Sequence, residues 1–451
     1  MPEISEAQVL DALRQVYDPD LNRDIVSLGF VKNVKICNGR VAFDIELTTP
    51  ACPVKDRLKE QAQAAVQSLP AVSQVNVNMT SQTRGRTVLA GEVLRGVKNI
   101  IAIASGKGGV GKSTATVNLA LALAATGAQV GILDADVYGP SIPGMLGCRD
   151  RLRVNDQGLA LPPQPFGLKI MSITLLVGED VPTIWRGPIA SRYLQMFLGS
   201  VEWGELDYLL MDLPPGTGDV QLTLAQSAPL NGAVIVTTPQ DIAMRVARKG
   251  LRMFETVQVP ILGIIENISG FVCPNCQTVH DIFRKGGGAR MARELGLPFL
   301  GAVPLDPRMV EAGDLGKPLF ALDPASPGAR AFEAIARNMA AQLSIVNVQT
   351  GAIKEQPKEI HLAGQTPPMI LWDDGAQMTY DHRKLRLACP CADCRNEMTG
   401  ETQLDESSLA PDVKVVEVRP VGRYGLNLVF SDGHSSGIFV HSLLRTLGSR
   451  A

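Results

Sequence analysis

The sequence has almost no net charge and no apolar run long enough to cross a membrane. Its 43 Lys and Arg residues are matched by 45 Asp and Glu residues, which leaves a formal net charge of −2 over 451 residues. This balance argues against the large basic surface that nucleic-acid binding needs and against attraction to an anionic membrane. A spanning helix needs about 18 consecutive apolar residues, and the chain has no such run. We therefore expect neither a nucleic-acid partner nor a membrane partner.

The start of the sequence also lacks the pattern of a secretory signal. Residues 1–20 are rich in acids and contain a single Arg, whereas a signal peptide begins with basic residues followed by an apolar run. We therefore expect a cytoplasmic protein. Five of the eight cysteines form two clusters, C-x-x-C at 273–276 and C-x-C-x-x-C at 389–394. In a reducing compartment, this spacing indicates metal or redox chemistry rather than structural disulfides.

The length predicts about three domains, and three segments are apparent. Residues 1–80 show helix, strand, strand, helix and strand patterns, with a hairpin at Asn38-Gly39, and predict a small α+β domain. Residues 96–345 alternate helices with short strands rich in Ile, Val and Leu, which predicts a mostly parallel α/β sheet buried on both faces. Residues 367–451 predict a small β-rich domain. The polar stretches between the segments, TSQTRGRT and residues 346–366, are expected to be linkers.

A phosphate-binding loop follows the first strand of the middle segment. Residues 106–113 read GKGGVGKS and fit the pattern G-x-x-x-x-G-K-[ST] of P-loop NTPases. The glycines let backbone N–H groups turn toward phosphate oxygens, and the next helix points its positive end at the same place. Lys112 would contact the β- and γ-phosphates, and Ser113 would bind Mg²⁺. The predicted nucleotide-binding residues of this loop are Gly106, Lys107, Gly108, Gly109, Val110, Gly111, Lys112, Ser113 and Thr114.

Three aspartates end strands of the same segment. Asp134 and Asp136 end the second strand, and Asp212 ends the third. Ligands of open α/β sheets bind at the carboxyl ends of the strands, where acids can hold Mg²⁺ or orient an attacking water. A single Asp in such a place is often a turn residue or a helix cap. Three of them beside a phosphate loop favour a functional site.

Several motifs of the middle segment resemble those of known ATPases. Lys107, the early lysine of GKGGVGKST, resembles that of the MinD/ParA class, where it reaches the nucleotide of the partner subunit. DADVYGPS, WRGP, DLPPGTGD, TTPQDIA and ENISGFVCPNC are together similar to the Mrp/ApbC iron–sulfur carriers. The resemblance implies a homodimer in which Asp136 positions the attacking water, Asp212 supports Mg²⁺ and Asn267 contacts adenine. The catalytic residues would then be Lys107, Lys112, Asp136 and Asp212.

Cys273 and Cys276 follow the fifth strand. Two thiolates at this spacing can share a metal or cluster or act as a redox pair. Two ligands are too few for a cubane cluster, but a symmetric dimer would supply the four cysteines that a 4Fe-4S cluster needs. The carriers that this chain resembles use this arrangement, with the cluster bridging two subunits. A zinc ion at the same interface and a pair of free thiols stay open as alternatives.

Three short motifs mark the N-terminal segment: DPD at 18–20, LGFV at 28–31 and TTPACP at 48–53. They resemble a small domain of iron–sulfur assembly factors and of the plant plastid form of the carrier, which usually shows Asp-Pro-Glu in the first motif. Cys52 stands where a strand gives way to a helix expected from residue 53. A helix N-terminus lowers the pKa of a thiol, but Cys52 is equally a candidate for a small buried apolar residue.

Cys389, Cys391 and Cys394 place three soft ligands within six residues. One more donor would complete a tetrahedral metal site. His434, after a predicted hairpin turn, is the candidate, and His382 is the rival. The spacing and the later histidine resemble the N-terminal zinc domain of γ-butyrobetaine dioxygenases. A structural Zn²⁺ site is favoured, with an iron–sulfur cluster or no metal as alternatives.

Together these features predict a carrier that binds ATP, hydrolyses it slowly and holds a labile 4Fe-4S cluster at a homodimer interface. Its partners would be apo iron–sulfur proteins and the cluster assembly machinery, and its cofactors ATP, Mg²⁺, the bridging cluster and Zn²⁺. The main alternative is a MinD/ParA-like spatial-positioning ATPase with the same phosphate loop. Such proteins usually carry a membrane-binding tail or a basic patch, whereas the tail HSLLRTLGSRA has about two helical turns and little basic charge. A zinc-containing adaptor whose conformation is set by ATP is a third interpretation.

Overall fold

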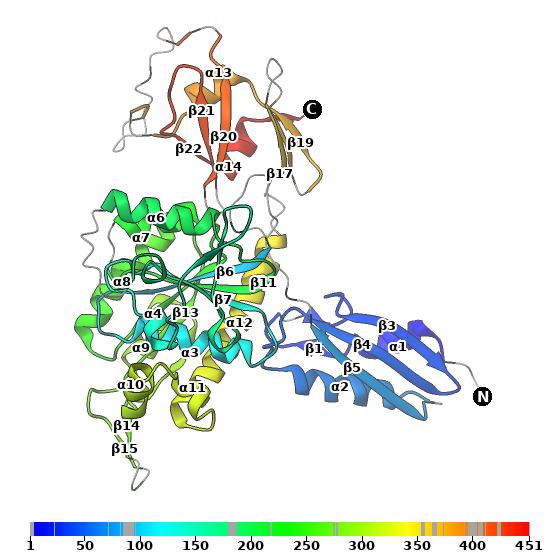
Figure 1. The fold of residues 1–451 in the computed structure, drawn as a ribbon. Helices are drawn as coiled ribbons and strands as arrows, with labels where there is room; N and C mark the ends of the chain where they lie inside the picture. The colour runs from blue at the N-terminus through cyan, green and yellow to red at the C-terminus, as the bar shows by residue number, and fades with distance from the viewer. Residues whose placement is uncertain are drawn as a thin grey trace.

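The computed structural model contains three folded units in chain order (Figure 1). The structure describes residues 4–21, 23–70, 72–81, 83, 94, 96–178, 187–216, 219–273, 276, 278–352, 357–362, 368–372, 374–391, 393–395, 404, 409–410, 412–421 and 425–450. Parts of the predicted motifs lie outside these residues, namely 82 and 84–87 of the first linker, 185–186 of WRGP, 217–218 of DLPPGTGD, 274–275 of CPNC, and 353–356 and 363–366 of the second linker.

The N-terminal unit is a three-stranded sheet, β3-β4-β5, against which two helices pack. The predicted hairpin forms at Asn38-Gly39, and β5 pairs with β4 in parallel after a helical crossover. Side chains of β4 alternate between buried and less buried, so one face of the sheet carries the core. The predicted α-β-β-α-β order is confirmed for the two helices and the three-stranded sheet, and the two-residue strands β1 and β2 were not predicted. Its elements are α1 (Glu6–Leu13), β1 (Tyr17–Asp18), β2 (Arg23–Asp24), β3 (Val31–Cys37), β4 (Arg40–Leu47), α2 (Lys55–Gln67) and β5 (Gln74–Ser81).

The middle unit is a seven-stranded parallel sheet with the order β10-β7-β11-β6-β12-β13-β16. Helices cover both faces: α3, α10, α11 and α12 share one core, while α6, α7, α8 and α9 share the other. Within β6, Ile101 and Ile103 face the first core, and Ile100 and Ala102 face the second. This two-sided burial explains the continuous apolar strands. The six strands predicted from the apolar runs NIIAIAS, AQVGILD, DYLLMD, AVIVTT, ILGIIEN and FLGAVP are confirmed as β6, β7, β11, β12, β13 and β16. The seventh, β10, was not predicted because it has only three residues.

The elements of the middle unit, in chain order, are these. They are β6 (Val97–Ser105), α3 (Lys112–Ala124), β7 (Val130–Asp134), α4 (Ile142–Met145), β8 (Arg153–Val154), β9 (Ala160–Leu161), a 3₁₀ turn (Pro165–Gly167), β10 (Lys169–Met171), α5 (Thr174–Val177), α6 (Gly187–Gly199), β11 (Leu206–Asp212), α7 (Asp219–Ser227), β12 (Gly232–Thr237), α8 (Asp241–Thr256), β13 (Ile261–Glu266), β14 (Phe271–Val272), β15 (Val279–His280), α9 (Gly287–Leu295), β16 (Phe299–Ala302), α10 (Pro307–Asp314), α11 (Leu319–Leu322) and α12 (Pro327–Ala352).

The C-terminal unit is β-rich, as predicted, and consists of the sheets β17-β18-β19-β23 and β20-β21-β22. Trp372, Tyr380, Phe430 and Phe439 are almost fully buried in its core. Its elements are β17 (Pro357–His361), β18 (Met369–Trp372), β19 (Gln377–Thr379), α13 (His382–Leu387), β20 (Val415–Val421), β21 (Gly425–Phe430), β22 (Ile438–Val440), α14 (His441–Leu447) and β23 (Ser449–Arg450).

The prediction that residues 346–366 form a linker is wrong at both ends. Helix α12 continues to Ala352, and the Asn347 amide donates to Asn99 Oδ1 at 2.8 Å, which ties this part of the helix to β6. Strand β17 pairs with β18 and therefore belongs to the C-terminal unit. Polar composition suggested a linker, but an exposed helix end and an edge strand also tolerate polar residues.

The TTPACP motif forms the contact between the N-terminal unit and the middle unit. Thr49 Oγ1 lies 2.6 Å from Tyr208 Oη in a buried hydrogen bond, and Thr48 Oγ1 donates to Ser344 Oγ at 3.1 Å. Ala51 is buried in the core that α3 and α12 share. The motif therefore has a docking role that its sequence alone did not indicate.

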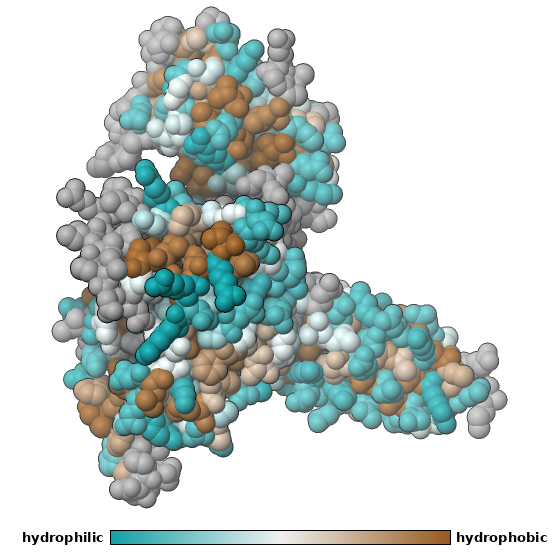
Figure 2. All heavy atoms as spheres, viewed as in Figure 1, coloured by the Kyte–Doolittle hydropathy of each residue, from teal (hydrophilic) through white to brown (hydrophobic). Residues whose placement is uncertain are grey.

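None of the described helices combines the length and the hydropathy that a membrane crossing requires. In the view of Figure 2, polar and apolar side chains are mixed over all three units.

Candidate functional site

The phosphate loop connects β6 to α3 at the carboxyl edge of the parallel sheet. Gly111 is the N-cap of α3 and has a φ of +79°. A β-carbon at this position would lie 2.2 Å from Asn267 Nδ2, so only glycine fits. The Asn267 amide donates to the Val110 carbonyl at 2.9 Å. The end of β13 therefore rests directly on the phosphate loop.

A cavity of about 690 Å³ opens beside this loop, a size suited to a nucleotide. Thr114 and Asn267, both among the predicted nucleotide-binding residues, line this cavity, and residues between 304 and 316, after β16, form another part of its wall. That wall was missed in the sequence. The signal that could have found it is the position of Pro304 to Asp306 directly after a parallel strand, at the same edge as the phosphate loop.

Three side chains of α3 converge on Asp212. Lys112 Nζ lies 2.7 Å from Asp212 Oδ2, and Ser113 Oγ donates to the same oxygen at 2.6 Å. Thr116 Oγ1 donates to Asp212 Oδ1 at 2.7 Å. Lys112 Nζ also lies 3.6 Å from Asp136 Oδ2. Because Lys112 and Asp212 are both buried, this ion pair has little competition from water.

Asp134 ends β7 beside Asp212 on the neighbouring strand. Burial, followed by the nearby Asp212 charge, raises the pKa of Asp134 to about 8. Its Oδ2 accepts from Ser172 Oγ and from the Ile142 N–H, whereas its buried Oδ1 has no hydrogen-bond partner among the described residues. Burial also raises the pKa of Asp136. The unpartnered oxygen of Asp134, on the strand beside Asp212, is of the type that Mg²⁺ prefers as a ligand.

Lys107 stands apart from this cluster. It is exposed on the loop, and its carbonyl accepts from Ser105 Oγ at 3.1 Å. Of the predicted catalytic residues, the single chain thus brings together Lys112, Asp136 and Asp212, and it leaves Lys107 at the surface.

Cys273 and Cys276 lie on the small β14–β15 hairpin. The Cys273 N–H donates to the Thr278 carbonyl at 3.0 Å, which closes the hairpin. Cys276 is exposed, and its Sγ lies 3.3 Å from Thr278 Oγ1. Hydrogen bonds from the Thr278 side chain and backbone, and then from Cys273, lower the pKa of Cys276 to about 6. Cys276 is therefore a thiolate near neutral pH, the form that binds metal.

The sequence left Cys52 open between an activated thiol and a small buried apolar residue, and its surroundings in the structure fit the second. Helix α2 begins at Lys55 after the N-cap Val54, so Cys52 precedes the helix end instead of standing at it. Its side chain packs against the core of the N-terminal unit. Burial raises its pKa to about 11. The structure therefore favours the alternative of a small apolar residue.

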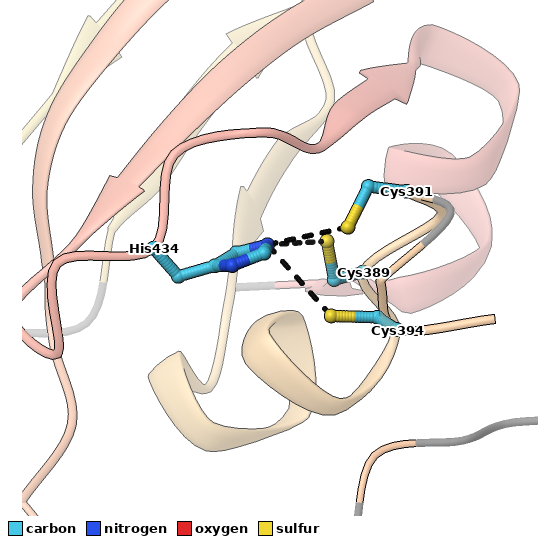
Figure 3. Close-up of side chains that lie close together, drawn as sticks. All are labelled: Cys389, Cys391, Cys394 and His434. Carbon is cyan, nitrogen blue, oxygen red and sulfur yellow. Dashed lines mark hydrogen bonds between the residues drawn. The ribbon is translucent and has the colours of Figure 1, made fainter.

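The C-terminal unit gathers Cys389, Cys391, Cys394 and His434 at one place. Figure 3 shows the three thiols pointing at the His434 ring from the chain that follows α13. Their Sγ atoms lie 3.2, 3.4 and 3.7 Å from His434 Nε2, and all four ligand atoms fall within 4.8 Å of one another. This donor set suits a tetrahedral metal ion.

Neighbouring residues support this cluster. The Arg386 guanidinium donates to Cys394 Sγ at 3.2 Å and to Asp432 Oδ2 at 2.7 Å. Asp432 Oδ1 accepts a hydrogen bond from the backbone N–H of His434. His382, the rival ligand, instead accepts the Val415 N–H through Nδ1 at 3.0 Å. Burial raises the pKa of Cys389 to about 12, so a cation would be needed to hold it as a thiolate.

The pKa of Asp134 predicts a pH dependence of stability. In the folded, nucleotide-free protein its pKa is about 8, above the ordinary 3.8, so the folded state retains a proton that the unfolded chain releases. The stability from this group is complete at low pH and falls as pH rises from about 4 to about 8. We expect Asp134→Asn to remove that decline.

The measurement is urea unfolding of both proteins between about pH 5 and pH 8 without nucleotide or Mg²⁺. The variant should gain stability relative to the parent protein as pH rises. Asp156→Asn, at an exposed position, is the control and should follow the parent. Parallel profiles for Asp134→Asn and the parent would contradict the assignment.

Family models match all three units. The model described as the NUBPL iron-transfer P-loop NTPase matches residues 96–340. A model for an iron–sulfur cluster assembly protein matches residues 6–79, and one for the N-terminal part of γ-butyrobetaine hydroxylase-like proteins matches residues 368–445.

Individual relatives agree with these matches. The chain is 47% identical over 343 residues to an iron–sulfur cluster carrier protein from Synechocystis, which covers 75% of this chain and 97% of that protein. It is 40% identical over 440 residues to the chloroplastic Fe-S cluster assembly factor HCF101 of Arabidopsis thaliana, which covers 96% of this chain and 81% of the relative. A solved nucleotide-binding protein from Archaeoglobus fulgidus, in complex with ADP, is 43% identical over 50% of this chain and 88% of that chain, with a TM-score of 0.45.

The resemblances inferred from the motifs are confirmed in each of the three units. The chain belongs to the Mrp/NUBPL-type iron–sulfur cluster carriers, P-loop NTPases that here carry an iron–sulfur assembly domain before the NTPase and a γ-butyrobetaine-hydroxylase-like N-terminal domain after it.

Proposed function

We propose that the protein binds and slowly hydrolyses ATP, holds a labile 4Fe-4S cluster as cargo between two copies of the chain, and delivers it to apo iron–sulfur proteins. The observation that carries this proposal is the β14–β15 hairpin, which carries the half-buried Cys273 and the exposed Cys276 and leaves the sheet at the same edge as the nucleotide cavity. A single chain offers two thiols there, whereas a cubane cluster needs four ligands. A symmetric dimer meets that requirement because each copy contributes the same pair.

The nucleotide chemistry follows from the Asp212 cluster. Mg²⁺, when bound, would neutralise phosphate charge, and Ser113 with Asp134 and Asp212 would hold it. Lys112, which contacts Asp212 and Asp136 in the nucleotide-free chain, would exchange one acid for the β- and γ-phosphates. Asp136 would then be released to orient the attacking water. Lys107, exposed on the loop, is free to reach the nucleotide of a partner subunit.

The C-terminal unit supports a separate structural role for zinc. Three thiols and one imidazole fill all four positions of a tetrahedral ion, so no position stays open for a substrate. In the view of Figure 1 this unit and the β14–β15 hairpin lie at opposite ends of the middle unit. The two sets of cysteines therefore do not form one site within the chain. A spatial-positioning ATPase, the earlier alternative, leaves both sets unexplained.

Lys112→Ala should reduce ATP turnover by at least about a hundredfold, because a buried positive charge at the phosphates has no substitute. Lys107→Ala should keep most nucleotide affinity and still slow hydrolysis, because its target is the partner's nucleotide. Nucleotide titration and phosphate release decide both, with the exposed Lys249→Ala as control. Equal loss of affinity in the Lys107 and Lys112 variants would exclude a role for Lys107 across the dimer.

Cys273→Ser or Cys276→Ser should lose the cluster while ATP binding survives, since each change leaves two cysteines in a dimer that needs four. Iron and sulfide, measured after anaerobic reconstitution, should approach one cluster per dimer in the parent protein. Cys37→Ser, at an exposed thiol of the N-terminal unit, should keep the parent value. Unchanged iron in both hairpin variants would place the cluster elsewhere.

Each chain should also bind one zinc ion at the C-terminal cluster. His434→Ala should lower the zinc content and the stability of this unit, because the ion links α13 to the β21–β22 connection. His382→Ala should retain zinc, since His382 Nδ1 accepts the backbone N–H of Val415 instead. Elemental analysis of the full chain distinguishes these outcomes. Zinc kept in His434→Ala and lost in His382→Ala would reverse the assignment, and iron with sulfide at this site would make it a second cluster site.

A further inference from the structure

Glu266 holds both ends of the segment that carries the cysteine hairpin. It ends β13, after which the chain leaves the sheet, forms β14 and β15, and returns as α9. Ser269 Oγ, at the start of the segment between β13 and α9, donates to Glu266 Oε1. The N–H groups of Gly286 and Gly288, at its end, donate to Oε1 at 2.8 Å and to Oε2 at 2.5 Å. One buried carboxylate thus closes a loop of about twenty residues.

The close contact on the α9 side requires glycine. A β-carbon at Gly288 would lie 3.0 Å from Glu266 Cβ and 3.2 Å from Oε2, too near for an unstrained fit. Glu266 is fully buried, so the three donors have no water to replace it. The glycines at 286–288 therefore allow the backbone to approach the buried Glu266 carboxylate closely.

The same segment forms part of the nucleotide cavity. Asn267, the next residue, contacts the phosphate loop through the Val110 carbonyl, and both Asn267 and Ile268 line the cavity. The Ser269 N–H donates to the Val303 carbonyl at 2.9 Å, and the Leu305 N–H donates to the Gly270 carbonyl at 2.8 Å. Leu305 also lines the cavity. The wall of the nucleotide site and the base of the hairpin are therefore bonded backbone to backbone.

The hairpin begins directly beyond these bonds. Phe271, the first residue of β14, forms a bridge with Leu305, and Cys273 follows two residues later. A displacement of Asn267 or Leu305 by nucleotide has a short covalent and hydrogen-bonded path to the cysteines. Glu266 lies at the point where that path meets the return into α9.

We propose that Glu266 is a positioning residue that couples occupancy of the nucleotide cavity to the placement of Cys273 and Cys276. The proposal rests on the function proposed above, since it concerns how nucleotide controls the cluster ligands. Glu266 is not among the described residues that line the cavity. It holds the two ends of the segment together, so that a displacement of the cavity wall would move the hairpin with it. Without this closure, the hairpin would move independently of the cavity.

Glu266→Gln is the informative substitution. The amide keeps the shape but replaces one acceptor oxygen with an NH₂ donor. Because N–H donors face both oxygens, the NH₂ group meets a donor in either orientation of the amide. Glu311→Gln, at an exposed position of α10 in the same unit, is the matched control.

The test is the rate at which Cys273 and Cys276 react with an alkylating reagent in cluster-free full-length protein, with and without Mg²⁺-ATP, followed by mass spectrometry. In the parent and in Glu311→Gln, nucleotide should change this rate by at least about fivefold, the lower end of common allosteric couplings. Glu266→Gln should bind nucleotide with similar affinity but show almost no change in rate. Cys37, exposed in the N-terminal unit, is an internal control that should not respond.

An equal nucleotide effect in Glu266→Gln and the parent, or no effect in the parent, would overturn the proposal. Ser269→Ala, which removes one donor from Oε1, is measured alongside in case Glu266→Gln does not fold. It should weaken the effect, and an undiminished effect would then count against the proposal. Iron content of the reconstituted parent is scored separately: a nucleotide effect on the thiols without any cluster binding would reject the carrier function and leave the coupling intact.

Discussion

The Asp212 carboxylate accepts hydrogen bonds from Lys112, Ser113 and Thr116, three residues at the start of the helix that follows the phosphate loop. This contact fixes α3 against β11 and determines where the loop between β6 and α3 can place its N–H groups. Both partners of the ion pair are buried, so removing either would leave an uncompensated charge. The raised pKa of Asp134 is related to this ion pair. A second full negative charge beside Asp212 would exceed what Lys112 alone can neutralise, which favours the protonated form of Asp134. Binding of phosphate and Mg²⁺ would redistribute these charges.

The parallel sheet determines which parts of the chain lie near the Asp212 cluster. All of its strands end at one edge, so residues after β6, β7, β11, β13 and β16 meet there although they are far apart in the chain. Two of these connections, after β13 and β16, also pair with each other and support the cysteine hairpin. The cavity beside the phosphate loop and the Cys273–Cys276 hairpin are therefore neighbours in the fold for a topological reason. By contrast, Cys389, Cys391, Cys394 and His434 all come from the C-terminal unit, and Cys389 and Cys394 are buried in the core of that unit.

Local patterns predicted much of this arrangement. The phosphate loop, the apolar strands and the spacing of the C-terminal cysteines each need only short stretches of sequence. His434 was selected because it follows a predicted hairpin turn and because a later histidine is part of the family resemblance, and the structure places it beside the cysteines. What could not be predicted depends on tertiary contacts. Tyr208 is an ordinary apolar strand residue until Thr49 docks on it, and Glu266 differs from any strand-end acid only through the glycines that return to it. Cys52 was ambiguous because a shift of two residues in the start of α2 removes the effect of the helix end on its pKa.

The central claim is that nucleotide and cluster influence each other through this shared edge. Linkage requires the influence to be reciprocal, so the most direct measurement is the affinity of the full-length protein for ATP with and without the cluster. Anaerobic titrations of the reconstituted and cluster-free forms with a fluorescent ATP analogue would supply both constants. The account predicts that they differ, by the same factor by which ATP changes the affinity of the protein for the cluster. Identical nucleotide affinities for the two forms would show that the sites are independent and would contradict the account.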